Sequence, residues 1–396
     1  MKKTLKIAIY SGEIPSTTFI ERLITGVAAS GTDVILFGSL HKQPAYISQV
    51  KVVGYRSTRL SKFWHLLRFT VLLTLFKRAE KKRLDRYLKQ QQTTDLYTKV
   101  KFYPILWYQP DVFHVQWAKG LDDWIWVQEF GMKLVLSLRG AHINYSPIAD
   151  LALAKMYQLN FPKVDGFHAV SEAIALESTK YGANSEAIRV VKSGLNLEDF
   201  AFKLKEFDSN VPLNIVSVGR DHWKKNYHSA LDAMFILKQQ GVPFQYHIIG
   251  VAENEALVFQ RAQLGLEKEV SFIETMPFNR VKEVIQQADV LLLPSVEEGI
   301  ANVVLEAMAL GTLVVSTDCG GMAEVVFPQE TGYLVPVRDV QAMAMTLVEV
   351  SQLSLEDYQG ITLKAREFVE RNHSEEKMVA GMMWVYERVV GRGESV

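Results

Sequence analysis

The sequence has a single cysteine, Cys319, among its 396 residues. One cysteine excludes an intramolecular disulfide framework and fits a reducing compartment. No stretch approaches the roughly 20 apolar residues that a membrane-spanning helix needs. The chain starts with basic residues, but its first apolar run is too short for a secretory signal. We therefore expect a protein that is made in the cytoplasm and stays there.

Net charge is also lacking, because 44 Lys and Arg balance 44 Asp and Glu. The totals therefore suggest no nucleic acid or other polyanion as a partner. Cys319 has no His or Cys at ligand spacing, so we expect no metal and no cofactor. The loop after the first expected strand, Leu5–Tyr10, lacks the G-x-G-x-x-G pattern. That absence disfavours a dinucleotide-dependent dehydrogenase.

The most informative stretch runs from residue 288 to residue 321. Val290–Leu293 and Leu313–Ser316 have the length and apolar character of buried strands, and Val303–Leu310 is typical of a short helix. A strand–loop–helix–strand unit makes the two strands parallel. It also places the loop at the carboxyl edge of the sheet, where α/β proteins bind ligands.

Two carboxylates belong to this unit, Glu298 on the loop and Glu306 one turn into the helix. The amides at the helix N-terminus, where Asn302 is the expected cap, suit a phosphate group. Since carboxylates do not bind phosphate, we expect both to accept hydrogen bonds from hydroxyl groups. A diphosphate with a sugar at one end and a ribose at the other satisfies these features. The alternative is a surface helix that happens to carry acids.

The Glu-x7-Glu pattern, followed by LEAMALG, a strand and two glycines, resembles the signature of retaining glycosyltransferase family 4. Within it, the chain is similar to bacterial polysaccharide-biosynthesis glycosyltransferases of the colanic-acid type. The resemblance implies that Glu298 contacts the donor sugar and Glu306 the nucleotide ribose. It implies further donor contacts by Gly299, Ile300, Ala301, Asn302 and Val303.

A second loop carries cations and follows the expected strand Asn214–Val218. Gly219 allows close backbone approach, and Arg220 and Lys225 can reach a diphosphate, the arginine in bidentate fashion. The loop resembles the family's G-R-x4-K-G element, with Asn226 in place of the last glycine, which implies that both cations bind the diphosphate.

Two further positions belong to this half of the chain. Lys224, beside Lys225, is expected to be solvated. Met276 lies where related enzymes bracket the nucleobase.

The first half of the chain resembles the family more loosely. Its DVFHVQ segment keeps His114, which we expect to be a hydrogen-bonded core residue. Its RGAHIN loop places His142 where an acid often stands, and this makes His142 the better candidate for contacting acceptor hydroxyls. The other acceptor-side candidates are Gly12, Thr18, Gln116 and Arg139. For Thr18, helix capping is an equally good explanation.

The resemblance implies the α/β GT-B fold, in which two Rossmann-like domains with parallel sheets face a central cleft. We expect an acceptor-binding domain over residues 1–205 and a nucleotide-sugar-binding domain over 206–375. Residues 376–396 are expected to form a helix that packs back towards the first domain. The polar, aperiodic segment Asp199–Val211 is the expected linker.

The segment 56–101 has thirteen Lys and Arg against three acids, a net charge of +10, which leaves −10 elsewhere. It contains FWHLLRFTVLLTLF, which is too short and too polar to span a bilayer. One hypothesis is that it lies on an anionic membrane surface with Trp64, Phe69 and Phe76 inserted. The alternative is a helix that packs on its own sheet and leaves a solvated basic face.

The sequence therefore predicts a metal-independent, retaining transfer of a sugar from a nucleotide-diphosphate sugar to a hydroxyl of a glycan or lipid-linked acceptor. Arg220, Lys225, Glu298 and His142 are the candidate catalytic residues. The alternative activity is that of a sugar-nucleotide epimerase, which needs no acceptor site. A non-catalytic interaction protein would show degraded donor loops, whereas both loops are intact.

Overall fold

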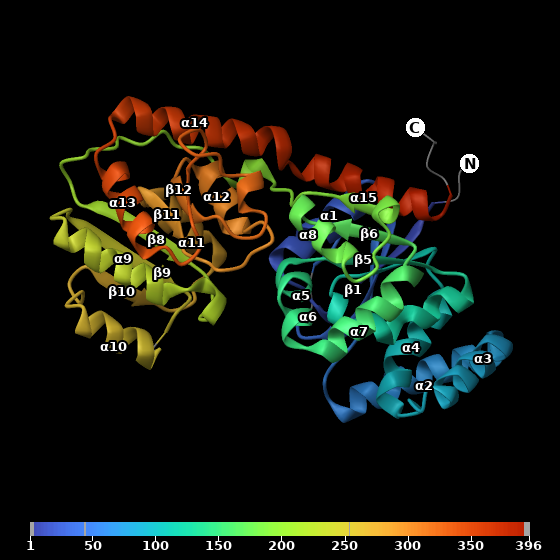
Figure 1. Ribbon diagram of the computed structural model, residues 1–396. Coiled ribbons are helices and arrows are strands. Elements are labelled where there is room, and N and C mark those ends of the chain that lie inside the picture. Colours follow the sequence, from blue (N-terminus) through green and yellow to red (C-terminus); the bar gives the residue numbers. More distant parts are fainter. Residues whose placement is uncertain (1–3, 43–44, 253, 392–396) are drawn as a thin grey trace. The chain divides into compact units, whose positions relative to one another are not determined.

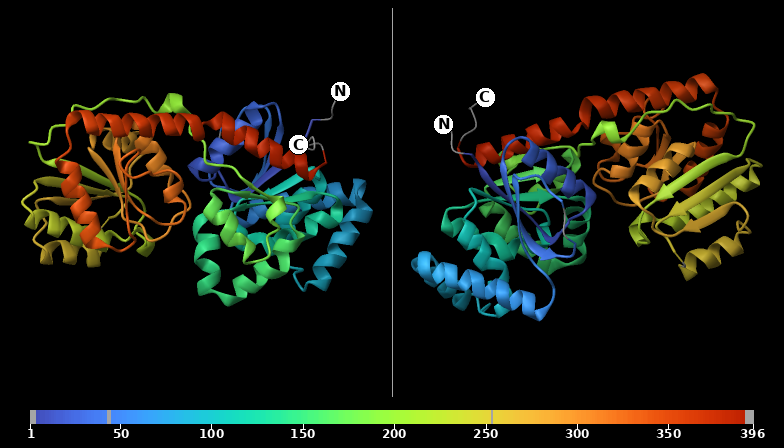
Figure 2. Two further views of the ribbon diagram at one scale, coloured as in Figure 1. Left: turned by 45° about the horizontal axis from the view of Figure 1, so that its top comes forward. Right: turned by 180° about the vertical axis from the view of Figure 1, so that it is seen from behind.

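The structure is a computed structural model that describes residues 4–42, 45–252 and 254–391. The chain forms two compact units, one comprising residues 1–170, 175–194 and 375–396 and the other residues 171–174 and 195–374. Each unit contains a parallel sheet with helices on both faces (Figures 1 and 2). The predicted α/β class with two Rossmann-like domains is confirmed.

The first unit contains a parallel sheet with the strand order β3-β2-β1-β4-β5-β6-β7. Its strands are β1 (Lys6–Ile14), β2 (Asp33–Leu40), β3 (Val50–Tyr55), β4 (Val112–Val115), β5 (Lys133–Leu138), β6 (Gly166–Ala169) and β7 (Ile188–Val190). Its helices are α1 (Thr18–Ala29), α2 (Arg59–Phe76), α3 (Arg78–Gln90), α4 (Leu96–Tyr108), η1 (Ala118–Phe130), α5 (Gly140–Asn144), α6 (Ser146–Ala149), α7 (Leu151–Asn160), η2 (Phe161–Lys163), most of α8 (Glu172–Thr179), η3 (Ser185–Ala187) and α15 (Glu375–Val389).

Strand β1 is longer than its sequence pattern predicts, because it continues through the segment expected to be a loop. After an irregularity between Ile9 and Gly12, Gly12 to Ile14 pair with β2. Gly12 has a φ of +89°, which a glycine adopts without strain. Backbone pairing with β2 therefore determines the end of this strand, which the polar residues after Tyr10 obscure.

The second unit contains a parallel sheet with the strand order β10-β9-β8-β11-β12-β13. Its strands are β8 (Leu213–Val218), β9 (Phe244–Ile249), β10 (Val270–Ile273), β11 (Val290–Leu293), β12 (Leu313–Thr317) and β13 (Tyr333–Val335). Its helices are η4 (Leu197–Asp199), η5 (Trp223–Lys225), α9 (Tyr227–Gln239), α10 (Glu255–Gln263), α11 (Phe278–Gln287), α12 (Asn302–Leu310), η6 (Met322–Glu324), α13 (Val340–Ser351) and α14 (Leu355–Asn372). Strand β8 lies beside β11, so the order of the strands reverses between them.

The boundary between the units lies at residues 194 and 195, not at the predicted 205 and 206. The reason is hydrophobic: Leu195 and Phe200 are buried in the core of the second unit. Phe207, in the segment expected to be a linker, is buried as well, and its ring stacks 4.5 Å from that of Tyr358. Much of the predicted linker therefore packs along the second unit.

The last helix, α15, belongs to the first unit. Met378, Met382, Val385 and Tyr386 are buried in the same core as β1 and α1. The first unit is therefore completed by a segment that begins at residue 375, far along the chain from residue 194, where the rest of the unit ends. Among the helices of the described residues, none is both long enough and apolar enough to cross a bilayer.

Candidate functional site

Two loops meet at the centre of the second unit's sheet. Both leave the carboxyl ends of neighbouring strands, one β8 and the other β11, where the strand order reverses. In open α/β sheets this is the point at which ligands bind. The loops are joined directly: the amide of Val296 donates to the carbonyl of Lys224 at 2.7 Å, and Asn226 Nδ2 donates to the carbonyl of Pro294 at 3.1 Å.

The side chains of the two loops form a buried charge cluster around Glu298. Lys225 Nζ lies 2.7 Å from Glu298 Oε1, and Lys224 Nζ lies 3.3 Å from Oε2. Ser295 Oγ also donates to Oε1. Burial by itself raises the pKa of Glu298, but the attraction and hydrogen bonds of the two lysines outweigh it and lower that pKa. Glu298 is therefore an ionised carboxylate fixed between two cations.

The prediction that Lys224 is solvated is wrong. The exposed fraction of the Lys224 side chain is only 19%, close to the 14% of the Lys225 side chain. The short helix η5 explains this, because it turns both consecutive lysines towards the β11 loop, with His222 Nδ1 accepting a hydrogen bond from the Lys224 amide. The sequence pattern of two adjacent lysines does not indicate that both side chains face the β11 loop.

Arg220 differs from the two lysines because its side chain is exposed. Within the described residues, no hydrogen bond or ion pair to its guanidinium is found. The backbone before it is crowded: a Cβ at Gly219 would lie 2.8 Å from Lys225 Cε and 2.9 Å from the Tyr227 hydroxyl. Gly219 thus leaves room for Lys225, and Arg220 remains available to a ligand in solution.

Asn226 occupies the position at which the family pattern has a glycine. Its backbone is left-handed, with φ +56° and ψ +38°. Asparagine tolerates this conformation better than most residues do. Its side chain also accepts a hydrogen bond from Ser229 Oγ at 2.9 Å, in addition to the bond to Pro294. The turn is therefore preserved without glycine.

Gly320 and Gly321 pack directly against the backbone of the Glu298 loop. The Gly321 amide donates to the carbonyl of Gly299 at 2.7 Å. Gly320 has a φ of +56°, and a Cβ there would lie 1.7 Å from the carbonyl oxygen of Glu298. Any side chain at Gly320 would therefore displace the loop that carries Glu298.

Helix α12 begins one residue earlier than predicted. Ala301 has the extended backbone of the N-cap, and Asn302 is the first helical residue, so the prediction that Asn302 caps the helix is wrong. Within the part of the chain that the structure describes, no side-chain hydrogen bond caps the N-terminus of this helix. The Oδ1 atom of Asn302 is buried and lacks a hydrogen-bond partner among the described residues. The polar groups at this terminus are thus left for a ligand.

The other predicted donor-side residues lie around this terminus or beside it. Glu306 is on α12 and is only 7% exposed. A residue that contacts a ribose at the surface was expected to be more exposed. Ile300 is also buried, and Val303 is partly buried. Met276 follows β10 and packs partly against the same core.

The predicted acceptor-side residues belong to the first unit, and two of them lie in a buried polar network. Gln116 is completely buried, and its Oε1 accepts a hydrogen bond at 2.8 Å from Arg139. His114 is confirmed as a core histidine: Nδ1 contacts the Tyr386 hydroxyl at 2.7 Å and Nε2 contacts Ser137 at 2.8 Å. Burial lowers the pKa of His114 well below its usual range.

Arg139 is a partly buried arginine without a carboxylate partner among the described residues. Burial lowers its pKa to about 9. Its guanidinium lies 4.5 Å from the centre of the Phe19 ring and donates to Gln116. Arg139 and Gln116 therefore stabilise each other inside the unit.

The remaining acceptor-side candidates lie nearer the surface. His142 was predicted on a loop but lies in the short helix α5, with its ring 5.3 Å from that of Trp117. Thr18 is the first residue of α1, where Thr17 is the cap without a side-chain cap bond. Gly12 lies in the bulged end of β1 and lines a hollow at the carboxyl edge of the first unit's sheet.

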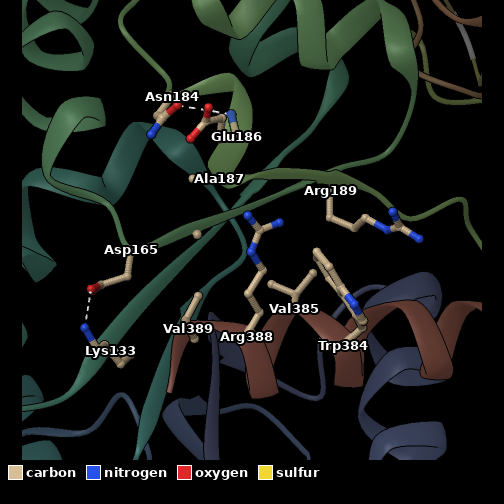
Figure 3. A pocket seen from close by; sticks show the side chains of 11 residues that line it. Lys133, Asp165, Asn184, Glu186, Ala187, Arg189, Trp384, Val385, Arg388 and Val389 are labelled. Atoms are coloured by element: carbon tan, nitrogen blue, oxygen red, sulfur yellow. Dashed lines mark hydrogen bonds and ion pairs between the residues drawn. The ribbon is translucent and has the colours of Figure 1, made fainter. Parts of the chain in front are cut away.

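Another hollow, of about 280 Å³, lies at the opposite, amino edge of this sheet, between β5, β6 and α15 (Figure 3). The ring of Trp384 lies between the guanidiniums of Arg189 and Arg388, 4.8 and 4.9 Å from them. Lys133 pairs with Asp165 at 2.8 Å. None of the predicted site residues lines it.

Comparison with known proteins identifies the second unit. The family described as "Glycosyl transferases group 1" matches residues 201–368. The chain contains a glycosyl transferases group 1 domain. All residues of the Glu298 and Arg220 loops fall within the matched range.

Curated relatives match over part of their length. The chain is 36% identical over 227 residues to WcaL of Escherichia coli (strain K12), which is assigned to colanic acid biosynthesis as a glycosyltransferase, with 56% of each chain covered. It is 35% identical over 215 residues to the amylovoran biosynthesis glycosyltransferase AmsK of Erwinia amylovora, with 52% of each chain covered. The chain thus spans about half the length of the curated relatives it matches.

Solved structures match the whole fold. A sucrose-phosphate synthase from Thermosynechococcus elongatus has a TM-score of 0.75 at 16% identity, covering 98% of this chain and 99% of that chain. A glycosyltransferase from Rickettsia africae ESF-5 has a TM-score of 0.70 at 16% identity with the same coverage. The predicted GT-B fold is confirmed. In the described part of the chain, no cluster of three or more His, Cys, Asp or Glu is arranged to hold a metal ion.

Proposed function

We propose that this chain is a glycosyltransferase that moves a sugar from a nucleotide-diphosphate sugar to a hydroxyl group, with retention at the anomeric carbon and without a metal ion. One observation carries the proposal: a loop with Arg220 and Lys225 meets a loop with Glu298 where the strand order reverses in a group 1 domain. Cations for a diphosphate and a carboxylate for sugar hydroxyls are thus combined at one place.

The transfer breaks the bond between the anomeric carbon and the diphosphate oxygen and forms one to the acceptor oxygen. The acceptor proton passes to the departing phosphate, so no separate base is required. Arg220, Lys225 and the uncapped amides of α12 stabilise the charge that develops on the leaving group. In this mechanism Glu298 positions the sugar and Glu306 holds the ribose.

Glu298 and the diphosphate of the donor compete for the ammonium group of Lys225, because Lys225 already forms an ion pair with Glu298. Since Lys225 Nζ lies 2.7 Å from Glu298, a diphosphate that binds Lys225 shares or takes over this contact. Lys224, on the other carboxylate oxygen, can keep Glu298 ionised and in place. Glu298 is then free on one side to accept hydrogen bonds from the sugar.

The names of similar proteins support the donor class and the pathway. HepE of Anabaena, which has the same fold, has been solved with UDP-glucose, at a TM-score of 0.69 and 16% identity. The curated relatives act in colanic acid and amylovoran biosynthesis by name. We therefore place this chain in polysaccharide biosynthesis, with a glycan or lipid-linked acceptor.

A thermal-shift screen of uridine- and guanosine-diphosphate sugars tests the proposal. A ligand at one hundred times its Kd stabilises the protein by about 2.7 kcal/mol, which raises Tm by several degrees. We expect one nucleotide class to do so equally with EDTA and with added magnesium. Absence of a shift with every nucleotide sugar contradicts a donor site. A shift that requires the metal contradicts the metal-independent mechanism.

We further propose that α2 rests on an anionic membrane surface. Its exposed apolar residues recur at helical spacing and form a stripe along one face: Leu60, Phe63, Trp64, Leu67, Val71 and Leu75. The next helix, α3, exposes Arg78, Lys82, Arg86 and Lys89, for which no acidic partner is found within the described residues. An apolar stripe beside unpaired cations is the combination that anionic lipid recognises.

Of the three residues predicted to insert, Trp64 lies in this stripe and Phe76 is exposed at the end of α2, but Phe69 does not belong to this surface. Phe69 is 1% exposed and packs against His65 and Tyr108, because it faces α4. Lys77 also turns inward and donates to the carbonyl of Leu106. The membrane surface is therefore the stripe on α2 together with the four exposed cations of α3.

A further inference from the structure

The hollow of about 280 Å³ in the first unit lies at the amino ends of β5, β6 and β7, with α15 along one side (Figure 3). Open α/β sheets bind their substrates at the opposite, carboxyl ends of the strands. The volume is close to the lower end of the range of about 300–1,000 Å³ that small-molecule sites occupy. The hollow therefore suits a small ligand that takes no part in the transfer reaction.

Small residues of the sheet allow α15 to approach it closely and leave the hollow open. Gly166 is the first residue of β6, and a Cβ there would lie 2.6 Å from Val389 Cγ1 on α15. Ala187, just before β7, also has a small side chain. Val385 is buried beside Val389, so the side of the hollow formed by α15 is partly apolar. Packing between helix and strands thus fixes the shape of the hollow.

Two arginines from different elements are held against one tryptophan ring in this hollow. Arg388 follows Trp384 by one turn of α15, and Arg189 lies on β7. Their guanidinium carbons lie 4.9 and 4.8 Å from the centre of the Trp384 ring. Tryptophan is the aromatic side chain that attracts a cation most strongly. A guanidinium that contacts a ring by its face keeps its in-plane N–H groups for an acceptor.

The charges of the two arginines are not compensated by nearby acids. Both side chains are exposed, and in the described part of the chain neither guanidinium has an ion pair or a hydrogen bond. The acid Asp165 also lines the hollow, but Lys133 pairs with it at 2.8 Å and the amide of Leu134 donates to it at 2.9 Å. Arg189 and Arg388 therefore remain available to an anion.

The opposite rim of the hollow carries an amide and a carboxylate. Asn184 Oδ1 accepts a hydrogen bond from the backbone amide of Glu186 at 3.1 Å, and Asn184 Nδ2 has no hydrogen-bond partner among the described residues. The Glu186 carboxylate is exposed and has no cation partner within the same residues. Figure 3 shows that Arg388 points from α15 towards this rim. A carboxylate repels an anion but accepts hydrogen bonds from hydroxyl groups.

We propose that this hollow binds a small phosphate monoester that also carries hydroxyl groups. Such a phosphate has close to two negative charges at neutral pH, which the guanidiniums of Arg189 and Arg388 balance. Asn184 Nδ2 is a further donor for the phosphate oxygens, and Glu186 accepts from a hydroxyl group of the ligand. Because Trp384 holds both arginines in advance, less side-chain entropy is lost on binding. The site does not depend on the proposed function.

Titration calorimetry on the full chain tests this site. The double variant Arg220→Ala, Lys225→Ala serves as the background, because the donor loops are a second place where a phosphate can bind. The probes are inorganic phosphate, glycerol 3-phosphate and glucose 6-phosphate, with glycerol and glucose as uncharged comparisons. We expect at least one phosphate ester to bind, more weakly as salt rises, and the uncharged compounds not to bind.

Variants of the two arginines locate the binding. Arg189→Gln and Arg388→Gln should each raise the Kd of the bound ester about tenfold or more, since each removes a charged donor. Lys155→Gln, at an exposed lysine of α7 that does not line the hollow, should leave the Kd unchanged. Circular dichroism without ligand should show each variant to be folded. Absence of binding by every phosphate, or an unchanged Kd in both arginine variants, overturns the proposal.

Two further variants test the ring and the carboxylate. Trp384→Phe should keep most of the affinity, whereas Trp384→Leu should lose it, because only the first retains a ring between the arginines. Glu186→Gln should strengthen the binding of inorganic phosphate and lower the preference for glycerol 3-phosphate over it. An unchanged preference contradicts the hydroxyl contact of Glu186.

A lipid headgroup is another source of phosphate. Sedimentation of Arg189→Gln and Arg388→Gln with phosphatidylserine vesicles should match that of the wild type, because the membrane surface proposed above lies on α2 and α3. Vesicle binding that is lost in these two variants would assign the arginines to lipid and overturn the proposal of a soluble ligand.

Discussion

The ammonium of Lys225 lies 2.7 Å from the carboxylate of Glu298, and this ion pair joins two loops that are 73 residues apart in sequence. Lys224 binds the other carboxylate oxygen, so one acid is held by two consecutive cations. In the proposed function a diphosphate takes over the contact of Lys225, while Lys224 keeps the carboxylate ionised and in place.

The charge state of Glu298 gives the first prediction. Its pKa is lowered in the folded protein, so its carboxylate stabilises the fold above the unfolded value of about 4.3. This contribution is lost as the pH falls through the lower, folded pKa. Glu298→Gln should therefore have a lower Tm than the wild type at pH 6 to 7, and the difference should shrink below about pH 4.3 in calorimetry. Glu283→Gln, at an exposed carboxylate on α11, serves as control. A Tm difference that is constant with pH contradicts the assignment.

The second prediction concerns the diphosphate. Arg220→Ala and Lys225→Ala should each lower kcat/KM by roughly two orders of magnitude, because each removes a charge directed at the leaving group. Steady-state kinetics with the donor found by thermal shift measure this. Lys268→Ala, at an exposed lysine of the same unit, should leave kcat/KM unchanged. Wild-type activity in both loop variants would mean that the diphosphate binds elsewhere.

The third prediction concerns the ribose. Glu306 is nearly buried, so replacing it with alanine would also remove packing. Glu306→Gln keeps the shape and removes the charge, and we expect it to weaken nucleotide binding about tenfold, since hydrogen bonds to charged groups contribute about 1.5–3 kcal/mol. Titration calorimetry measures the affinity. If the folded variant binds nucleotide as the wild type does, Glu306 does not hold the ribose.

The fourth prediction compares two glycines with similar backbones. Gly320 and Gly265 have φ values of +56° and +63°, but a Cβ would lie 1.7 Å from the Glu298 carbonyl at the first and in open space at the second. Gly265→Ala should cost only the strain of a left-handed alanine, about 1 kcal/mol. Gly320→Ala should cost more and should also weaken nucleotide binding, measured by denaturation and calorimetry. Equal losses of folding free energy in the two variants would show that the Glu298 loop can move aside without a cost in stability.

The fifth prediction concerns the membrane surface. Changing Arg78, Lys82, Arg86 and Lys89 to Gln should abolish most vesicle binding at low salt, since each contributes about 1 kcal/mol. Changing Phe63 and Trp64 to Ser should instead remove the binding that persists at high salt, because apolar insertion is not screened. Sedimentation with phosphatidylserine vesicles separates the two, with Lys268→Gln as the control. If the wild type does not bind these vesicles at low salt, the exposed residues of α2 and α3 form only a solvated surface.

Local patterns in the sequence predicted most of the framework. Val290–Leu293 and Phe244–Ile249 form strands over the predicted residues, because apolar runs of this length can be buried only in a central sheet. The predicted roles of Arg220 and Glu306 stay predictions. Their positions on the β8 loop and on α12 follow from the alternation of strands and helices.

Errors arose where a side chain's environment depends on another element. Lys224 was expected to be solvated, because the carboxylate that it binds comes from the β11 loop, which is distant in sequence. Gln116 and Arg139 bind each other, which no local pattern shows, and their predicted contact with an acceptor stays a prediction. Phe69 looked like part of an inserting face, whereas α4 covers it.

The sequence by itself determined the two parallel sheets, the carboxyl-edge position of the acidic and basic loops, and the family of the second unit. These depend on hydrophobic periodicity and on motif spacing, which act over a few residues. Only the tertiary structure decided which cation meets Glu298, which acceptor-side residues are buried, and that Arg189, Trp384 and Arg388 line one hollow. The physical reason is that strand order brings distant segments together, and no local pattern encodes the distance between two side chains that lie on different strand ends.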